Sequence, residues 1–197
     1  MRATTRRELV QGPAGTIECA VDDPEGAPRG IALVAHPHPL FGGTLDNKVV
    51  QTLARAFVEL GYSAWRPNFR GVGASGGAHD EGRGEADDLV AVLEHLKAEK
   101  PVLAGFSFGA AVQARLSQKV APERMVLVGL AVQKSAVPAV PANTLLIHGE
   151  KDDTVPLAAV LEWALPQDLP VVVVPGADHF FHRRLNVLRA IVTSNWK

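Results

Sequence analysis

Short, continuous apolar runs alternate with longer amphipathic stretches along most of this chain. Such runs are typical of strands covered on both faces, and they occupy 31–35, 62–67, 102–104, 124–130, 144–148 and 171–174. Helical spacing of apolar residues predicts helices over 47–60, 85–97, 110–116 and 156–163, and around Leu185, Leu188 and Val192. The alternation predicts an α/β fold, with a mostly parallel sheet and helices on both faces.

Two further segments, 7–10 and 16–21, flank the turn residues Gly12-Pro13-Ala14-Gly15 and predict a hairpin of edge strands. A chain of 197 residues is long enough for one domain with a full core and short for two. The sequence contains no internal repeat or low-complexity tract. We therefore expect a single domain over 1–197.

Polar and glycine-rich segments follow the predicted strands after Ala35, Pro67, Ala104, His148 and Val174. Ligand sites in open parallel sheets gather at the carboxyl ends of the strands. We therefore expect these five segments to meet at one edge of the sheet and to form the functional site there.

The segment Gly105-Phe106-Ser107-Phe108-Gly109 lies between a predicted buried strand and a predicted helix. This order is that of a nucleophile elbow, in which a serine on a strained turn projects its hydroxyl from the sheet. The flanking glycines avoid contacts that a Cβ would make with the neighbouring strand or helix. The alternative interpretation is a glycine- and serine-rich connection without chemistry.

A serine hydroxyl becomes an effective nucleophile when a base accepts its proton and a third group orients that base. Asp152 lies in the segment after the strand 144–148, and His179 lies in the segment after the last strand. The resulting order Ser107, Asp152, His179 is that of a hydrolase triad on an α/β fold. Asp153, which could cap the next helix, and His182, which could lie at the surface, are the alternatives for the acid and the base.

Five segments together resemble the α/β-hydrolase superfamily over nearly the whole chain, and in particular small bacterial serine hydrolases related to dienelactone-hydrolase-like enzymes. They are the segments 36–43, 68–75, 105–109, 148–156 and 176–182. The resemblance implies a catalytic triad of Ser107, Asp152 and His179. A glycine usually follows the second histidine of the last segment in this pattern, whereas this chain has Arg183, which could change the charge at the rim of the site.

The resemblance also implies an oxyanion hole built from backbone amides. The amide of Phe108, directly after the nucleophile, is the first expected donor. The second should come from the loop after Ala35, in which Pro37 and Pro39 have no N–H; we predict Leu40, with His38 and Phe41 as alternatives.

The remaining histidines have structural interpretations. We expect His36 and His38 to shape their loop through hydrogen bonds to the backbone and His148 to be a satisfied residue at a strand end. His79 and His95 are expected at the surface. A metal site built on His36, His38 and His179 is the alternative, but no carboxylate spacing supports it, so we expect no metal.

Composition excludes several other classes of protein. The formal net charge of −1 gives no electrostatic footprint for nucleic acid or an anionic membrane. Cys19 is the single cysteine, so no internal disulfide can form.

The run Gly71-Val-Gly73-Ala-Ser-Gly76 matches a dinucleotide fingerprint, but no helix is expected until after Gly84, so we expect no cofactor. The first residues contain no secretory leader and no apolar run is long enough to span a bilayer, so we expect a cytoplasmic protein.

Members of this superfamily often have a cap domain, for which the interval 131–143 is too short. An open cleft suits a small acyl substrate and argues against lipase action at an interface. We therefore expect a carboxylesterase, monomeric or homodimeric, acting on a small molecule through an acyl-enzyme. Thioesterase, lactonase, peptidase or cofactor-free perhydrolase chemistry on the same triad, and a non-catalytic binding protein on the same fold, are the alternatives.

Overall fold

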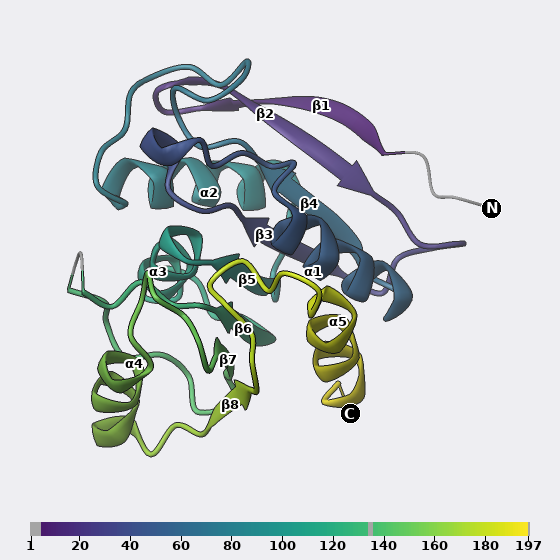
Figure 1. Ribbon diagram of the computed structural model, residues 1–197. Helices are drawn as coiled ribbons and strands as arrows, with labels where there is room; N and C mark the ends of the chain where they lie inside the picture. The colour runs from purple at the N-terminus through teal and green to yellow at the C-terminus, as the bar shows by residue number, and fades with distance from the viewer. Residues whose placement is uncertain (1–4, 134–135, 197) are drawn as a thin grey trace.

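The computed structural model describes residues 5–133 and 136–196, and eight strands within them form one sheet (Figure 1). The strands are β1 (Arg6–Gly12), β2 (Gly15–Asp22), β3 (Ile31–Ala35), β4 (Ser63–Pro67), β5 (Val102–Phe106), β6 (Arg124–Val128), β7 (Leu145–Gly149) and β8 (Val171–Val174). Their spatial order is β1-β2-β4-β3-β5-β6-β7-β8. The hairpin β1–β2 is antiparallel, and β2 joins β4 antiparallel, whereas β3 to β8 all run parallel.

Five α-helices of the described residues cover the two faces of this sheet. Helices α1 (Lys48–Glu59) and α5 (Leu185–Ser194) pack on one face, and α2 (Arg83–His95), α3 (Phe108–Leu116) and α4 (Leu157–Ala164) pack on the other (Figure 1). Successive residues of a strand face opposite sides. In β3, accordingly, Leu33 belongs to one hydrophobic core and Val34 to the other. The α/β architecture expected from the pattern is confirmed.

The predicted elements differ from the observed ones mainly at their ends. Helix α3 begins at Phe108, directly after the serine, because the turn itself starts the helix, whereas periodicity became visible only from residue 110. Helix α2 begins at Arg83, where buried Glu85 accepts hydrogen bonds from the amides of Asp80 (2.9 Å) and Gly82 (2.8 Å). Strand β6 ends at Val128 because Gly129 has a φ of +53°.

The glycine-rich run 71–76 has a structural use. Its Gly76 amide donates to the carbonyl of Thr16 at 2.8 Å, so the run packs against the β1–β2 hairpin. A Cβ on Gly73 would lie 2.3 Å from the Glu18 carboxylate. The glycines here allow close approach of two loops.

Candidate active site

Ser107 lies on a strained turn at the carboxyl end of β5. Its φ of +56° and ψ of −117° lie outside the usual regions for an L-residue, and its amide donates to the carbonyl of Val128 at 2.9 Å. A Cβ on Gly105 would lie 2.5 Å from the Gly109 carbonyl oxygen, and one on Gly109 would lie 2.4 Å from that of His36. Close packing of strand, turn and helix therefore requires both glycines, as the elbow interpretation predicts.

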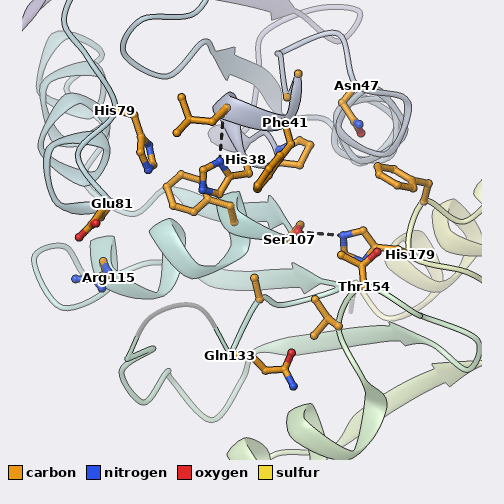
Figure 2. A pocket seen from close by; sticks show the side chains of 18 of the residues that line it. His38, Phe41, Asn47, His79, Glu81, Ser107, Arg115, Gln133, Thr154 and His179 are labelled. Carbon is orange, nitrogen blue, oxygen red and sulfur yellow. Dashed lines mark hydrogen bonds between the residues drawn. The ribbon is translucent and has the colours of Figure 1, made fainter.

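The structure brings Ser107, His179 and Asp152 together in one chain of hydrogen bonds. The Ser107 hydroxyl lies 3.0 Å from Nε2 of His179, whose Nδ1 lies 2.7 Å from Oδ2 of Asp152 (Figure 2). All three residues are buried. The side chains come from the turn after β5 and from the loops after β7 and β8, so the predicted convergence of these loops at one sheet edge is observed.

The carboxylate of Asp152 is held by its own loop. Its Oδ1 accepts hydrogen bonds from the amides of Thr154 (3.0 Å) and Val155 (2.8 Å), which leaves Oδ2 directed at His179. Asp153, the alternative acid, is exposed, and its carboxylate accepts a hydrogen bond from the neighbouring Thr154 hydroxyl. His182, the alternative base, is exposed and pairs with Asp178.

Aromatic rings position the imidazole of His179. The ring of Phe106 lies 4.8 Å from it between centroids, and the ring of Phe180 meets it edge-on at 5.2 Å. Phe180 and Phe181 follow His179 directly but do not both pack beneath it: Phe180 lies at the exposed rim, and Phe181 is buried in the core with α1 and α5. Phe106, on the adjacent strand, was not predicted in this role.

His36 shapes its loop as expected. Its Nε2 accepts from the amide of Phe69 at 2.9 Å, so the proton lies on Nδ1, which donates to the carbonyl of Pro37 at 2.6 Å. Burial lowers the pKa of His36 to about 4, although the hydrogen bond to Pro37 acts in the opposite direction. His36 is therefore a neutral structural residue.

His148 lies behind the carboxylate of Asp152. Its Nε2 donates to the carbonyl of Val155 at 2.9 Å and lies 3.4 Å from Oδ2 of Asp152. Burial lowers the pKa of this imidazole against the hydrogen bond to Val155. Among the described residues Nδ1 has no hydrogen-bond partner, so the expected satisfied histidine is only half satisfied.

The two predicted oxyanion donors differ in whether their amides already have a hydrogen-bond acceptor. Phe108 is the first residue of α3, so its amide has no intrahelical acceptor. The Leu40 amide donates to Nδ1 of His38 at 3.3 Å, and the Phe41 amide donates to the His38 carbonyl at 3.1 Å. Leu40 therefore stays a prediction, and it would have to exchange this hydrogen bond for one to the substrate.

A cleft of about 910 Å³ opens over Ser107. His38, Phe41 and Phe108 form an aromatic wall on one side, with ring centroids 4.7–4.8 Å from that of His38, and Thr154 and Gln133 lie opposite (Figure 2). His79 also lines this cleft, with its ring 4.8 Å from His38, so the expectation that His79 is an exposed residue is wrong. His95 is exposed as expected.

The departure from the usual pattern at Arg183 has a conformational meaning. Arg183 has a φ of +60°, in the left-handed region that glycine adopts without strain. The side chain is exposed and is not among the residues that line the cleft. The arginine that stands in place of the usual glycine therefore raises the conformational energy of the backbone in this turn.

Comparison with known proteins places this geometry in a family. Residues 38–139, about half of the chain, match the model of the alpha/beta hydrolase fold. The chain belongs to this family.

Two solved structures extend this likeness over the full chain. A structure described as an alpha-beta serine hydrolase homologue from Coxiella burnetii is 38% identical, with a TM-score of 0.91 and complete coverage of both chains. A protein from Xanthomonas campestris, described as a member of the a/b serine hydrolases without lid, is 36% identical, with a TM-score of 0.92, and the match covers 99% of this chain and 94% of that one. This hydrolase fold is thus shared with lidless serine hydrolases.

A curated relative, an uncharacterized protein of Rickettsia prowazekii, is 43% identical over 110 residues. The match covers 53% of this chain and 46% of that protein, so it spans about half the length of the relative. No helix in the described part of the chain is long and apolar enough to cross a bilayer.

Proposed function

We propose that this hydrolase is a carboxylesterase that cleaves small esters through an acyl-enzyme. The observation that supports this proposal is the hydrogen-bond chain from the Ser107 hydroxyl through His179 to Asp152, open to a cleft that no described helix or strand covers. A serine, a base and an orienting carboxylate in this order are the parts that acyl transfer needs.

In the first half of the reaction, the Ser107 oxygen attacks the ester carbonyl carbon while Nε2 of His179 accepts the hydroxyl proton. Asp152 stabilises the resulting imidazolium. The negative charge on the carbonyl oxygen is received by the Phe108 amide and a second donor from the loop 38–41, and the electropositive N-terminus of α3 favours it. The tetrahedral intermediate then collapses, the C–O bond to the alcohol breaks, and His179 returns its proton to the leaving alkoxide.

In the second half, water enters the cleft and His179 accepts one of its protons. The hydroxide attacks the acyl carbon, the bond to Ser107 breaks, and the proton on His179 restores the serine hydroxyl. The products are one carboxylic acid and one alcohol, and the enzyme is unchanged.

Hydrolysis of p-nitrophenyl acetate, butyrate and octanoate tests the proposal. We expect turnover of the short esters and a loss of about 10⁴-fold or more in Ser107→Ala and about 10⁴-fold in Asp152→Asn. The matched control is Asp153→Asn, whose exposed carboxylate should not matter.

A fluorophosphonate adduct on Ser107, read by intact mass, provides a second readout. No adduct and no ester turnover would overturn the proposal in favour of a binding protein. Thioesters, lactones and a peroxide-dependent bromination assay in the same panel identify the other acyl chemistries, and a preference for one of them over every ester would equally overturn carboxylesterase activity.

A further inference from the structure

Arg115 extends the cleft away from the triad. It lies in the last turn of α3, about two turns beyond Phe108, and residues at this spacing share one helix face. Its side chain is half-buried and lines the same cavity as Ser107. Figure 2 shows Arg115 and Glu81 at the end of the cleft opposite His179.

The guanidinium of Arg115 has no hydrogen-bond or ion-pair partner among residues 5–133 and 136–196. The other arginine of this wall, Arg83, pairs with Asp80 at 2.9 Å and with Glu81 at 3.6 Å. The acid nearest to this end of the cleft is therefore engaged with Arg83. A half-buried cation without an acceptor has lost hydration that a bound anion would replace.

The local backbone leaves room for this side chain. Gly82 precedes α2 with a φ of +87°, and a Cβ there would lie 3.5 Å from Nε of Arg115 and 3.5 Å from Cγ2 of Val112. The guanidinium therefore lies near the start of α2, on the side where Gly82 has no side chain.

We propose that Arg115 binds a carboxylate at the far end of the substrate whose ester group is attacked by Ser107. This inference rests on the proposed function, and it narrows the substrate class to half-esters of dicarboxylic acids. An arginine fork matches a carboxylate in a bidentate geometry that neutral groups cannot reproduce.

The helix sets the length of such a substrate. Ser107 and Arg115 lie about 12 Å apart along α3, at about 1.5 Å per residue. Helical side chains tilt toward the N-terminus, so the guanidinium reaches back toward the serine. The remaining gap fits a spacer of roughly two to four methylene groups between the two carbonyl carbons.

A simpler role for Arg115 is to complement the negative end of the α3 dipole. In that role its removal would lower the stability of the fold and would change the turnover of charged and neutral esters alike. Substrate selectivity, measured as a ratio, distinguishes the two roles.

The experiment compares monoethyl succinate, glutarate and adipate with ethyl butyrate, pentanoate and hexanoate, with acid release followed in a pH-stat. We expect at least one half-ester to have a higher kcat/KM than the neutral ester of equal carbon number. Arg115→Met should remove this preference, with a loss of about 10- to 100-fold that appears mainly in KM, and should change neutral esters less than twofold. Arg189→Met, an exposed arginine on α5, is the matched control.

Calorimetric titration of the Ser107→Ala variant with adipate separates this inference from the proposed function. One outcome is that adipate binds, that Arg115→Met abolishes this binding, and that the protein cleaves no ester. This outcome would support the anion site and overturn the esterase. Turnover of neutral esters with no preference for half-esters and no binding of adipate or glutarate would overturn the anion site and leave the esterase intact. An equal effect of Arg115→Met on both ester series would also overturn it.

Discussion

Two residues show how the backbone and the interior constrain single side chains near the site. Arg183 occupies a left-handed conformation that costs an L-residue about 1 kcal/mol. His36 is neutral because burial opposes its charge. Each of these two residues leads to a prediction that a single substitution can test.

Arg183→Gly should stabilise the fold. Relief of the left-handed strain exceeds the added entropy of the unfolded chain, so we expect the free energy of unfolding in urea to rise by about 0.5 kcal/mol. Arg184, the next residue, has a φ of −121° and provides the control. Arg184→Gly should destabilise by about 0.5–1 kcal/mol, and equal effects of the two substitutions would contradict the argument.

His36 should make the fold sensitive to mild acid. Its pKa of about 4 in the folded state is below the ordinary value of 6.5, so between these values the unfolded chain binds a proton that the native state does not. Stability contributed by neutral His36 is therefore complete above about pH 6.5 and is lost as the pH falls toward 4, by about 3 kcal/mol in total. His148, whose pKa burial also lowers, acts in the same direction.

Urea unfolding at pH 7.5, 5.5 and 4.5 measures this dependence. His36→Gln should flatten the profile, whereas His95→Gln, at an exposed position, should preserve it. An unchanged slope in His36→Gln would show that other groups dominate the acid response.

At the scale of elements, one buried ion pair fixes helix α2 beneath the loop that follows β4. Arg70 donates from two nitrogens to the carboxylate of Asp88, both at 2.8 Å, and its guanidinium lies against Gly84, where a Cβ would be 1.9 Å from Nη1. The hydrogen bonds to Asp88 raise the pKa of Arg70, so its guanidinium is charged throughout the usual pH range.

Removal of one partner of this pair should cost more than removal of both. Arg70→Met leaves the Asp88 carboxylate buried without a partner, so we expect a loss of about 3 kcal/mol or more in the free energy of unfolding. The double variant Arg70→Met, Asp88→Leu replaces both charges by apolar groups and should recover most of that loss. If the two losses simply add, the buried charge is not what destabilises the single variant.

The elements that sequence predicts best are those whose cause is local. The run 31–35 coincides with β3 because a strand covered on both faces needs apolar residues at every position. The apolar pattern predicts the beginning of α3 too late. The reason is that Ser107 and Gly109 are required by the packing of the elbow and are not residues that favour a helix.

The residues of the candidate site likewise fall into those that local sequence predicts and those that it does not. Ser107, Asp152 and His179 lie in motifs of fixed spacing and could be located from the sequence. His79 and Arg115 could not, because their place in the cleft depends on how α2 and α3 pack. The spacing of Phe108 and Arg115 on one helix face was the one available signal for the latter.

At the scale of the whole molecule, no helix or strand within residues 5–133 and 136–196 forms a lid over the cleft. The described residues of the interval 131–143 form no helix or strand, and the exposed side chains of Leu40, Phe41 and Phe180 lie around the opening. In the part of the chain that the structure describes, no helix or strand has to move before substrate reaches Ser107.

Ester hydrolysis should therefore follow simple saturation across the solubility limit of the substrate. The tributyrin concentration is raised from below to above its solubility limit, where droplets form. We expect no additional rise in the hydrolysis rate at that point, because an open site does not need an oil–water interface to become accessible. Titrimetric rates measured beside a lidded lipase as positive control check this. A sharp increase at the solubility limit would indicate a conformational gate.

The three triad side chains come from residues 107–179, whereas much of the wall that faces them comes from the loops after β3 and β4. The proton-transfer groups and much of the cleft wall are thus encoded by different stretches of the gene. Laboratory evolution confined to codons 38–43 and 79–83 would sample new specificities while the proton-transfer groups stay in register. This separation makes the protein a convenient starting scaffold for engineered biocatalysts.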